Sequence, residues 1–312
     1  MYVLGLELLF VVLWSSGFIG AKYGLPYAGV FTLLFVRYVC VAMLLLGWLA
    51  YRQELRFHSQ TAIARAAVIG VLAHAIWLST ALGGIALGVS PWIVALITAL
   101  QPMATNVLSG PLLKESISAV QWCGTALGLV GVVLIVVTKL EGAAGAAPVA
   151  YVLPFVAAAS MTLATLYQRH LNRTQPSQNL PIIQSLFVQA VASAIALSPL
   201  AVFVEGLSIQ WNQQFVLTLA WLIIVLSIGS YGLMLKLLEF RTAARVASLM
   251  YLTPPTTLVL GFLLFNDQIA WVDAVGLLIA AIGVVLVYQG EPERAQGGAP
   301  TSGAKKLRGM MP

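Results

Sequence analysis

The sequence predicts an all-α polytopic membrane protein of ten transmembrane helices, arranged as two inverted five-helix repeats. Three observations predict this fold: a very apolar composition, apolar stretches of spanning length separated by charged residues, and an internal repeat. Of the 312 residues, 60% are hydrophobic and only 8% are charged, whereas soluble domains carry roughly 25% charged residues. Such a chain cannot build a water-facing surface, so lipid is the expected solvent for most of it.

The apolar stretches give the expected helices in order. The first, 3–21, lacks both a basic leading region and a small-residue cleavage site, so we interpret it as a retained helix and not as a signal peptide. Four more are expected at 29–51, 66–86, 91–113 and 119–138. A second set of five is expected at 150–168, 182–204, 215–236, 244–265 and 271–288.

Lysine and arginine residues set the expected orientation, because cytoplasmic loops retain them. With the N-terminus inside, thirteen fall on the cytoplasmic side: Arg52, Arg56, Arg65, Lys114, Arg169, Arg173, Lys236, Arg241, Arg245, Arg294, Lys305, Lys306 and Arg308. Outside there are only Lys22 and Lys139, with Arg37 within the second helix. We therefore expect a multi-pass protein of the inner or plasma membrane with both termini in the cytoplasm.

Charge and cysteine content argue against several other classes. The net charge of +6 comes from basic residues between apolar stretches, which is the pattern of membrane topology and not of a nucleic-acid partner. Cys40 and Cys123 both fall inside apolar stretches, so we expect no disulfide, no metal site and no cofactor. Residues 289–312 are expected to form a disordered cytoplasmic tail, with contact to anionic membrane lipid as the alternative.

The chain aligns with itself, without a gap, at an offset of 152 residues. This alignment superposes Leu100-Gln101-Pro102 on Leu252-Thr253-Pro254, Glu115 on Asp267, Gly124 on Gly276, and Gly131-Val132-Val133-Leu134 on Gly283-Val284-Val285-Leu286. Equivalent helices are five apart, an odd number, so the second repeat must cross the membrane in the opposite sense. We place the repeats at 1–140 and 149–288. Inverted repeats are typical of secondary transporters with a midplane site; a duplicated structural protein is the alternative.

Several segments resemble the EamA family of the drug/metabolite transporter superfamily. They are Leu13-Trp14-Ser15-Ser16-Gly17-Phe18 through Lys22, Phe35-Val36-Arg37-Tyr38, Leu100-Gln101-Pro102 through Leu113-Lys114-Glu115, Gly124 to Leu134, and their second-half counterparts Leu252-Thr253-Pro254-Pro255, Asn266-Asp267 and Gly276 to Leu286. The resemblance covers roughly Val3 to Tyr288. It implies ten helices in two inverted halves and, in most members, export of amino acids, other metabolites or toxic compounds.

Prolines near the centres of the fourth and ninth helices mark possible cavity walls. Pro102 and the pair Pro254 and Pro255 remove backbone donors, so carbonyl groups are freed at mid-membrane depth, where they either face a cavity or only shape packing. Thr98 and Gln101 share a face of the fourth helix, and Thr253 is the corresponding polar residue of the ninth helix. Polar side chains in lipid point inward.

A histidine and four aromatic residues complete the expected solute site. His74 lies near the centre of the third helix, one turn from Trp77, and is either a hydrogen-bonded packing residue or a contact for a proton and solute. Trp14, Tyr231 and Tyr251 are further candidates for an aromatic wall. With no carboxylate or cation placed centrally, the pocket is expected to suit neutral or zwitterionic solutes with an apolar part.

Charged residues near helix ends have other expected roles. Lys22 and Arg37 lie toward the outer side, where they either snorkel to the interface or form a gate near a carboxylate-bearing solute. Glu115 and Asp267 are expected to cap helix ends at opposite faces of the membrane and to organise the starts of the helices that follow. Glycines of the fifth and tenth helices permit close packing, either between the halves or in a dimer.

We therefore expect a secondary transporter that exports an amino acid or related metabolite by alternating access, as a monomer or homodimer. A nucleotide-driven pump is disfavoured because the sequence lacks a glycine-rich phosphate loop. An intramembrane enzyme is disfavoured because there is no His-Glu-x-x-His motif and no carboxylate pair at one depth. A passive channel or scaffold, or an exporter of hydrophobic drugs or amines, is the alternative.

Overall fold

The computed structural model describes residues 2–57, 59–113, 118–141, 146–175, 180–240, 246, 249–267 and 269–289. These residues form helices and short connections, with one isolated β-bridge between Ala28 and Ile209. In the described part, eight helices are long and apolar enough to cross a membrane, and Met250–Phe265 and Trp271–Val287 are shorter apolar helices. The all-helical, multi-pass expectation is confirmed to this extent.

The helices follow the expected order. Those of the first half are α1 (Tyr2–Gly24), α2 (Val30–Tyr51), α3 (Gln60–Gly70), η1 (Val71–Ile76), α4 (Trp77–Ala86), α5 (Pro91–Thr98), α6 (Gln101–Leu113) and α7 (Ala119–Glu141). Those of the second half are α8 (Pro148–Thr174), α9 (Ile182–Phe203), α10 (Gln213–Ala220), η3 (Trp221–Ser230), α11 (Tyr231–Phe240), η4 (Met250–Leu252), α13 (Thr253–Phe265) and α14 (Trp271–Gln289). The segments α3, η1 and α4 form one continuous helix, as do α10, η3 and α11.

The third and sixth helices extend furthest beyond the expected apolar stretches. The third begins at Gln60 instead of residue 66, because the hydroxyl of Ser59 accepts a hydrogen bond from the backbone N–H of Ala62 at 3.2 Å and caps it there. The sixth continues to Thr174 instead of residue 168. Hydropathy marks the length of helix that lipid surrounds, whereas caps and polar side chains determine where the helix itself begins and ends.

The predicted central prolines coincide with helix breaks. The fourth helix is interrupted at Ala99 and Leu100, and Pro102 then occupies the first turn of α6. Pro254 and Pro255 likewise lie in the first turn of α13, after the 3-10 turn η4. The first turn of a helix is the position that tolerates a missing N–H, so each proline starts a new helical segment instead of kinking one.

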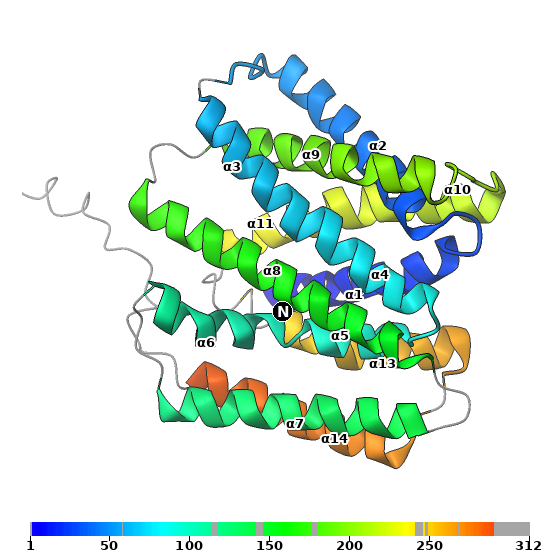
Figure 1. Ribbon diagram of the computed structural model, residues 1–312. Coiled ribbons are helices and arrows are strands. Elements are labelled where there is room, and N and C mark those ends of the chain that lie inside the picture. Colours follow the sequence, from blue (N-terminus) through cyan, green and yellow to red (C-terminus); the bar gives the residue numbers. More distant parts are fainter. Residues whose placement is uncertain are drawn as a thin grey trace, which may run out of the picture.

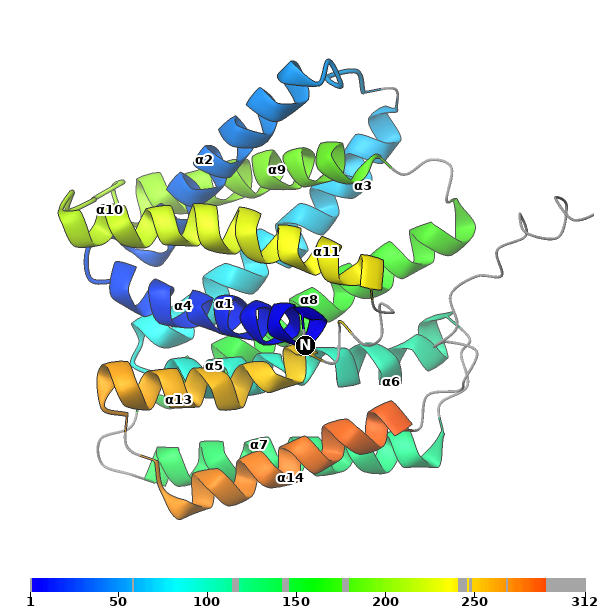
Figure 2. The ribbon, with the colours of Figure 1, turned by 180° about the vertical axis from the view of Figure 1, so that it is seen from behind.

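The equivalent helices α7 and α14 pack side by side in both views (Figures 1 and 2). A Cβ atom on Gly124 would lie 2.6 Å from the carbonyl oxygen of Gly283, and one on Gly131 would lie 2.5 Å from that of Gly276. Contacts on α14 move toward lower numbers as those on α7 move toward higher ones, so the helices are antiparallel. Glycine allows this approach, and the pair joins the two halves within one chain.

The second equivalent pair, α2 and α9, is also antiparallel (Figure 1). The carboxylate of Glu205, just past α9, accepts hydrogen bonds from the backbone N–H groups of Phe31 and Thr32 at the start of α2. At the opposite end, the Gln184 side chain at the start of α9 donates to the backbone oxygen of Glu54, just past α2, at 2.8 Å. Equivalent helices therefore run in opposite directions, as an inverted repeat requires.

The 152-residue offset is also visible in the caps of α7 and α14. The hydroxyl of Ser118 accepts from the N–H of Gln121, whose side chain accepts from the N–H of Ser118. At the equivalent positions, the carboxylate of Asp273 accepts from the N–H of Ala270 at 2.9 Å. Asp267 lies at a helix end as expected, and its backbone N–H donates to the carbonyl oxygen of Gly261 in α13. Its carboxylate pairs with Lys22, and the start of α14 is capped by Asp273 instead; Glu115 lies outside the described residues.

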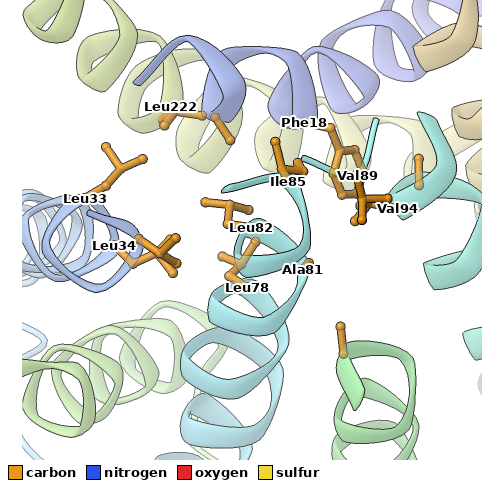
Figure 3. Packing of buried hydrophobic residues seen from close by; sticks show 14 of the residues in the cluster. Phe18, Leu33, Leu34, Leu78, Ala81, Leu82, Ile85, Val89, Val94 and Leu222 are labelled. Atoms are coloured by element: carbon orange, nitrogen blue, oxygen red, sulfur yellow. The ribbon is translucent and has the colours of Figure 1, made fainter. Parts of the chain in front are cut away.

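The largest apolar core lies where α1, α2, α4, α5 and η3 meet. Figure 3 shows Leu33 and Leu34 of α2, Leu78 and Leu82 of α4, and Leu222 of η3 converging there. These residues are buried, and Leu33 and Leu34 are 0% exposed. This core fills the end of the molecule at which α1 ends and α2 begins.

Candidate functional site

A cavity of about 560 Å³ continues from this core between helices of both halves. Its lining comes from α1, α2, η1 and α4 in the first half and from α9 and η3 in the second. The lining residues are Trp14, Gly17, Phe18, Ala21, Arg37, Tyr38, Val41, Leu44, Leu45, Trp48, His74, Trp77, Leu78, Leu82, Ile183, Leu186, Ala190, Leu226, Ser227 and Ile228. This is the volume and apolar character of a site for a small organic molecule.

The cavity is closed at one end and reaches the surface at the other. Phe18, Leu78 and Leu82 belong both to its lining and to the apolar core, so packed side chains seal this end. Toward the C-terminal half of α2 the lining becomes exposed, and Trp48 is 53% exposed. The cavity therefore reaches the surface along the C-terminal half of α2.

Arg37 is the charged residue of the lining. It is only 8% exposed, and its Nε and Nη2 atoms donate to the hydroxyl of Ser227 at 3.3 and 3.1 Å. Its guanidinium carbon lies 5.8 Å from the ring centroid of Tyr38. Of the two roles expected for Arg37, snorkelling to the interface is wrong, because the packing of α2 against η3 holds the guanidinium inside the protein.

His74 lies on the same polar side of the cavity. Its Nε2 atom is 3.1 Å from Oε1 of Gln189, and its ring centroid is 5.5 Å from that of Tyr38. An amide oxygen only accepts, so Nε2 carries the proton. The Gln189 amide nitrogen donates to the hydroxyl of Ser185 at 2.9 Å, so both ends of this amide are bonded.

A close helix contact places Gln189 beside His74. A Cβ atom on Gly70 would lie 2.6 Å from the Cα atom of Gln189, so only glycine allows α3 and α9 to approach this closely. The hydroxyl of Ser193 donates to the carbonyl oxygen of Gly70 at 3.0 Å at the same contact. The position of His74 thus depends on small residues at the contact between the third helix and α9.

Both polar positions contributed by the third and eighth helices lie on π-helical segments. His74 belongs to η1 and Ser227 to η3, and these segments occupy equivalent places in the two repeats. In η3 the hydroxyls of Ser227 and Ser230 donate to carbonyl oxygens five residues earlier. A π-helical turn inserts an extra residue, which changes the direction of the side chains around it, and such turns occur frequently at functional sites.

The expected site residues divide into two groups. Trp14, Arg37, His74 and Trp77 line the cavity. Thr98 does not, because its hydroxyl donates to the carbonyl oxygens of Val94 and Ala95 in its own helix.

Gln101 and the residues of α13 also lie outside the cavity lining. The Gln101 amide donates to the hydroxyls of Thr105 and Thr165 at 2.9 and 3.2 Å, so it links α6 to α8. Thr253 is 5% exposed and packed within the structure, and Tyr251 is partly buried. The side chain of Tyr231 lies outside the described residues.

Lys22 and the three prolines expected at the site lie outside the cavity lining. The Nζ atom of Lys22 lies 3.5 Å from Oδ1 of Asp267 and 3.9 Å from the ring centroid of Phe265, joining α1 to the end of α13. Pro102, Pro254 and Pro255 start helical segments and do not line the cavity.

Sequence reasoning missed Tyr38, Trp48, Gln189 and Ser227. Polar groups inside apolar helices are costly in lipid and point inward, so Gln189 and Ser227 carried a signal of this kind. Trp48 and Tyr38 carried none that separates them from ordinary aromatic residues. Within the described residues, no group of three or more His, Cys, Asp and Glu side chains gathers where a metal ion would bind.

Comparisons with known proteins extend these observations. Residues 1–137 and 148–289 match the sequence profile described as the EamA-like transporter family. No curated protein matches the sequence. A solved structure described as "Crystal structure of protein" superposes with a TM-score of 0.60 at 16% sequence identity, covering 92% of this chain and 96% of that chain. At this identity the likeness concerns the fold alone.

Proposed function

Because the chain belongs to the EamA-like transporter family, we propose that it is a secondary transporter that moves a small organic solute by alternating access. The observation that carries this proposal is a cavity of about 560 Å³ whose walls come from both inverted halves. In transporters built from inverted repeats, the solute site lies between the halves, and their relative movement exposes it to each side in turn. The ten-helix arrangement, as repeats at 1–140 and 149–288, is part of this proposal.

Alternating access needs one closed end that is able to open. Three polar contacts between the halves lie at the sealed end of the cavity. They are the hydrogen bonds of the Glu205 carboxylate to the first turn of α2, the β-bridge between Ala28 and Ile209, and the ion pair between Lys22 and Asp267. The Lys22 and Asp267 side chains are 32% and 12% exposed, and an ion pair near the protein surface contributes only about 0–1 kcal/mol. We infer that these contacts break and re-form in each cycle. The glycine-packed pair α7 and α14 is better suited to hold the halves together throughout.

We further propose export of an amino acid or related metabolite across the inner or plasma membrane, with both termini in the cytoplasm. The aromatic walls formed by Trp14, Trp48 and Trp77 support a solute with an apolar part. The excess of basic residues in the loops placed on the side of the termini supports the orientation. With this orientation, the open part of the cavity faces the cytoplasm, where an exporter loads.

Flux into proteoliposomes tests the proposal. A carrier gives saturable uptake of labelled solute that unlabelled solute on the opposite side accelerates. Linear, unsaturable flux would identify a channel, and absence of flux for every amino acid, analogue and hydrophobic amine would leave a scaffold. Liposomes without protein provide the leak rate, and fusions of a reporter to each terminus test the orientation.

A further inference from the structure

The charge of Arg37 has no acidic partner in the described part of the chain. Lys22 pairs with Asp267 and Arg52 with Glu54, both away from Arg37, and the cavity lining contains no aspartate or glutamate. Burying an unpaired cation costs free energy. Arg37 is 92% buried in the cavity, so a role such as ligand binding is needed to explain why the charge is kept there.

The guanidinium retains donors for a ligand. It has five N–H groups, whereas its hydrogen bonds in the structure use Nε and Nη2 on the single hydroxyl of Ser227. Ser227 therefore holds one edge of the planar group and leaves the Nη1 side unused in the described residues. A planar fork of this kind matches a carboxylate, which accepts two parallel hydrogen bonds.

Polar and apolar groups are separated around the cavity. Arg37, Tyr38, His74 and Ser227 contact one another or adjoin on one side. The remainder of the lining consists of tryptophan, phenylalanine, aliphatic and small residues. A molecule with one anionic end and an apolar body satisfies both parts, whereas an ammonium group meets no carboxylate in the lining.

We propose that the solute is an amphipathic organic anion whose carboxylate binds Arg37, with Ser227 positioning the guanidinium and with the apolar body against Trp14 and Trp77. This inference rests on the proposed transport function and names the substrate class of the same cavity. An amino group on the solute is tolerated but not required. Hydrophobic amines, which lack the anionic group, are poor ligands.

The test uses four small probes of similar shape: 3-phenylpropionate, 3-phenylpropanamide, 2-phenylethylamine and L-phenylalanine. Their binding to the purified protein is measured by thermal shift, since a ligand stabilises by RT ln(1 + [L]/Kd), and by tryptophan fluorescence, at low chloride concentration. We expect the acid to bind about tenfold or more tightly than the amide, as for other charge-assisted hydrogen bonds. The amine should bind more weakly than the acid.

Three variants test the residue. Arg37→Gln should bring the acid and the amide to within about threefold of each other, and Arg37→Lys should retain part of the preference because it keeps the charge but not the fork. Arg52→Gln is the matched control, since Arg52 is exposed and does not line the cavity; it should leave the preference unchanged. Comparing two ligands within one variant removes any general loss of stability.

Equal binding of acid and amide to the wild-type protein would overturn the inference, as would an unchanged preference in Arg37→Gln. Counterflow separates this failure from failure of the transport proposal. Saturable counterflow without a preference for acids overturns the anion site alone. Acid binding that depends on Arg37 without counterflow of any probe supports the anion site and overturns the transport function.

Discussion

Arg37 of α2 donates two hydrogen bonds to the hydroxyl of Ser227, which lies 190 residues later in the sequence and in the opposite half. This contact joins the second helix of one repeat to the π-helical segment of the eighth. The charged side chain of the cavity, in the first half, is thus held by a residue of the second half. In the alternating-access cycle proposed above, relative movement of the halves would change the surroundings of the guanidinium and so link ligand binding to the cycle.

Ser227→Ala tests how far the hydroxyl positions Arg37. Without this acceptor the guanidinium loses its fixed orientation, and we expect the affinity for 3-phenylpropionate to fall by about three- to tenfold, less than in Arg37→Gln. The control is Ser198→Ala, because Ser198 does not line the cavity and donates to the carbonyl oxygen of Ile195 in its own helix. A Ser227→Ala affinity equal to wild type would show that Arg37 needs no positioning residue.

Gln189→Leu tests the support of His74. The change leaves the Nε2–H of His74 without its acceptor and Ser185 without its donor, so we expect the protein to lose about 1–3 kcal/mol of stability. Thermal unfolding in detergent measures the loss. Gln168→Leu is the control, since Gln168 bonds to Asn172 on an exposed part of α8, and it should change stability by less than about 0.5 kcal/mol.

Asp267→Asn tests the closed end of the cavity. Loss of the ion pair with Lys22 should shift the population toward a state open at this end, with little change in stability. A cysteine at Ala21, in a background where Cys40 and Cys123 are replaced by serine, lies in the cavity lining and is 1% exposed. Its reaction with an impermeant maleimide added from the α13 C-terminal side should become faster.

The charge exchange of Lys22→Asp with Asp267→Lys should restore the slow labelling rate. Slow labelling in Asp267→Asn itself would mean that packing, and not the ion pair, closes this end.

Gly29→Ala tests the contact between α2 and α9. A Cβ atom on Gly29 would overlap the carboxylate of Glu205, displacing the group that accepts hydrogen bonds from the first turn of α2. We expect a loss of about 1–3 kcal/mol, from overpacking and from the lost cap. Gly47→Ala in α2 meets no atom within 4 Å and should be neutral or slightly stabilising. Equal melting temperatures for the two variants would contradict the contact.

The internal repeat in the sequence predicted the antiparallel arrangement of α7 and α14. The 152-residue offset superposed Gly124 on Gly276 and Gly131 on Gly283, and it required antiparallel halves because equivalent helices are five apart. In the structure Gly124 contacts Gly283 and Gly131 contacts Gly276, which is the crossed pairing that an inverted repeat produces. Such a pattern is readable because each glycine permits a backbone approach that any other residue prevents.

The sequence predicted only part of the lining of the candidate site. Trp14, Arg37, His74 and Trp77 were expected near it, and they line the cavity. Thr98 and Gln101 were expected there as well, but their polar groups are used within α5 and between α6 and α8. A polar side chain in an apolar helix must point toward protein or water, and the sequence does not distinguish a neighbouring helix from a cavity.

By itself, the sequence determined that the protein is helical, that lipid surrounds it and that its halves are related by inversion, because these properties follow from composition and periodicity along the chain. Only the tertiary structure decided that Arg37 lies inside a cavity beside Ser227 and His74. That arrangement depends on the rotation of each helix about its axis. Contacts between distant residues, such as Gly70 with Gln189 and Arg37 with Ser227, fix this rotation, and no local pattern of residues encodes it.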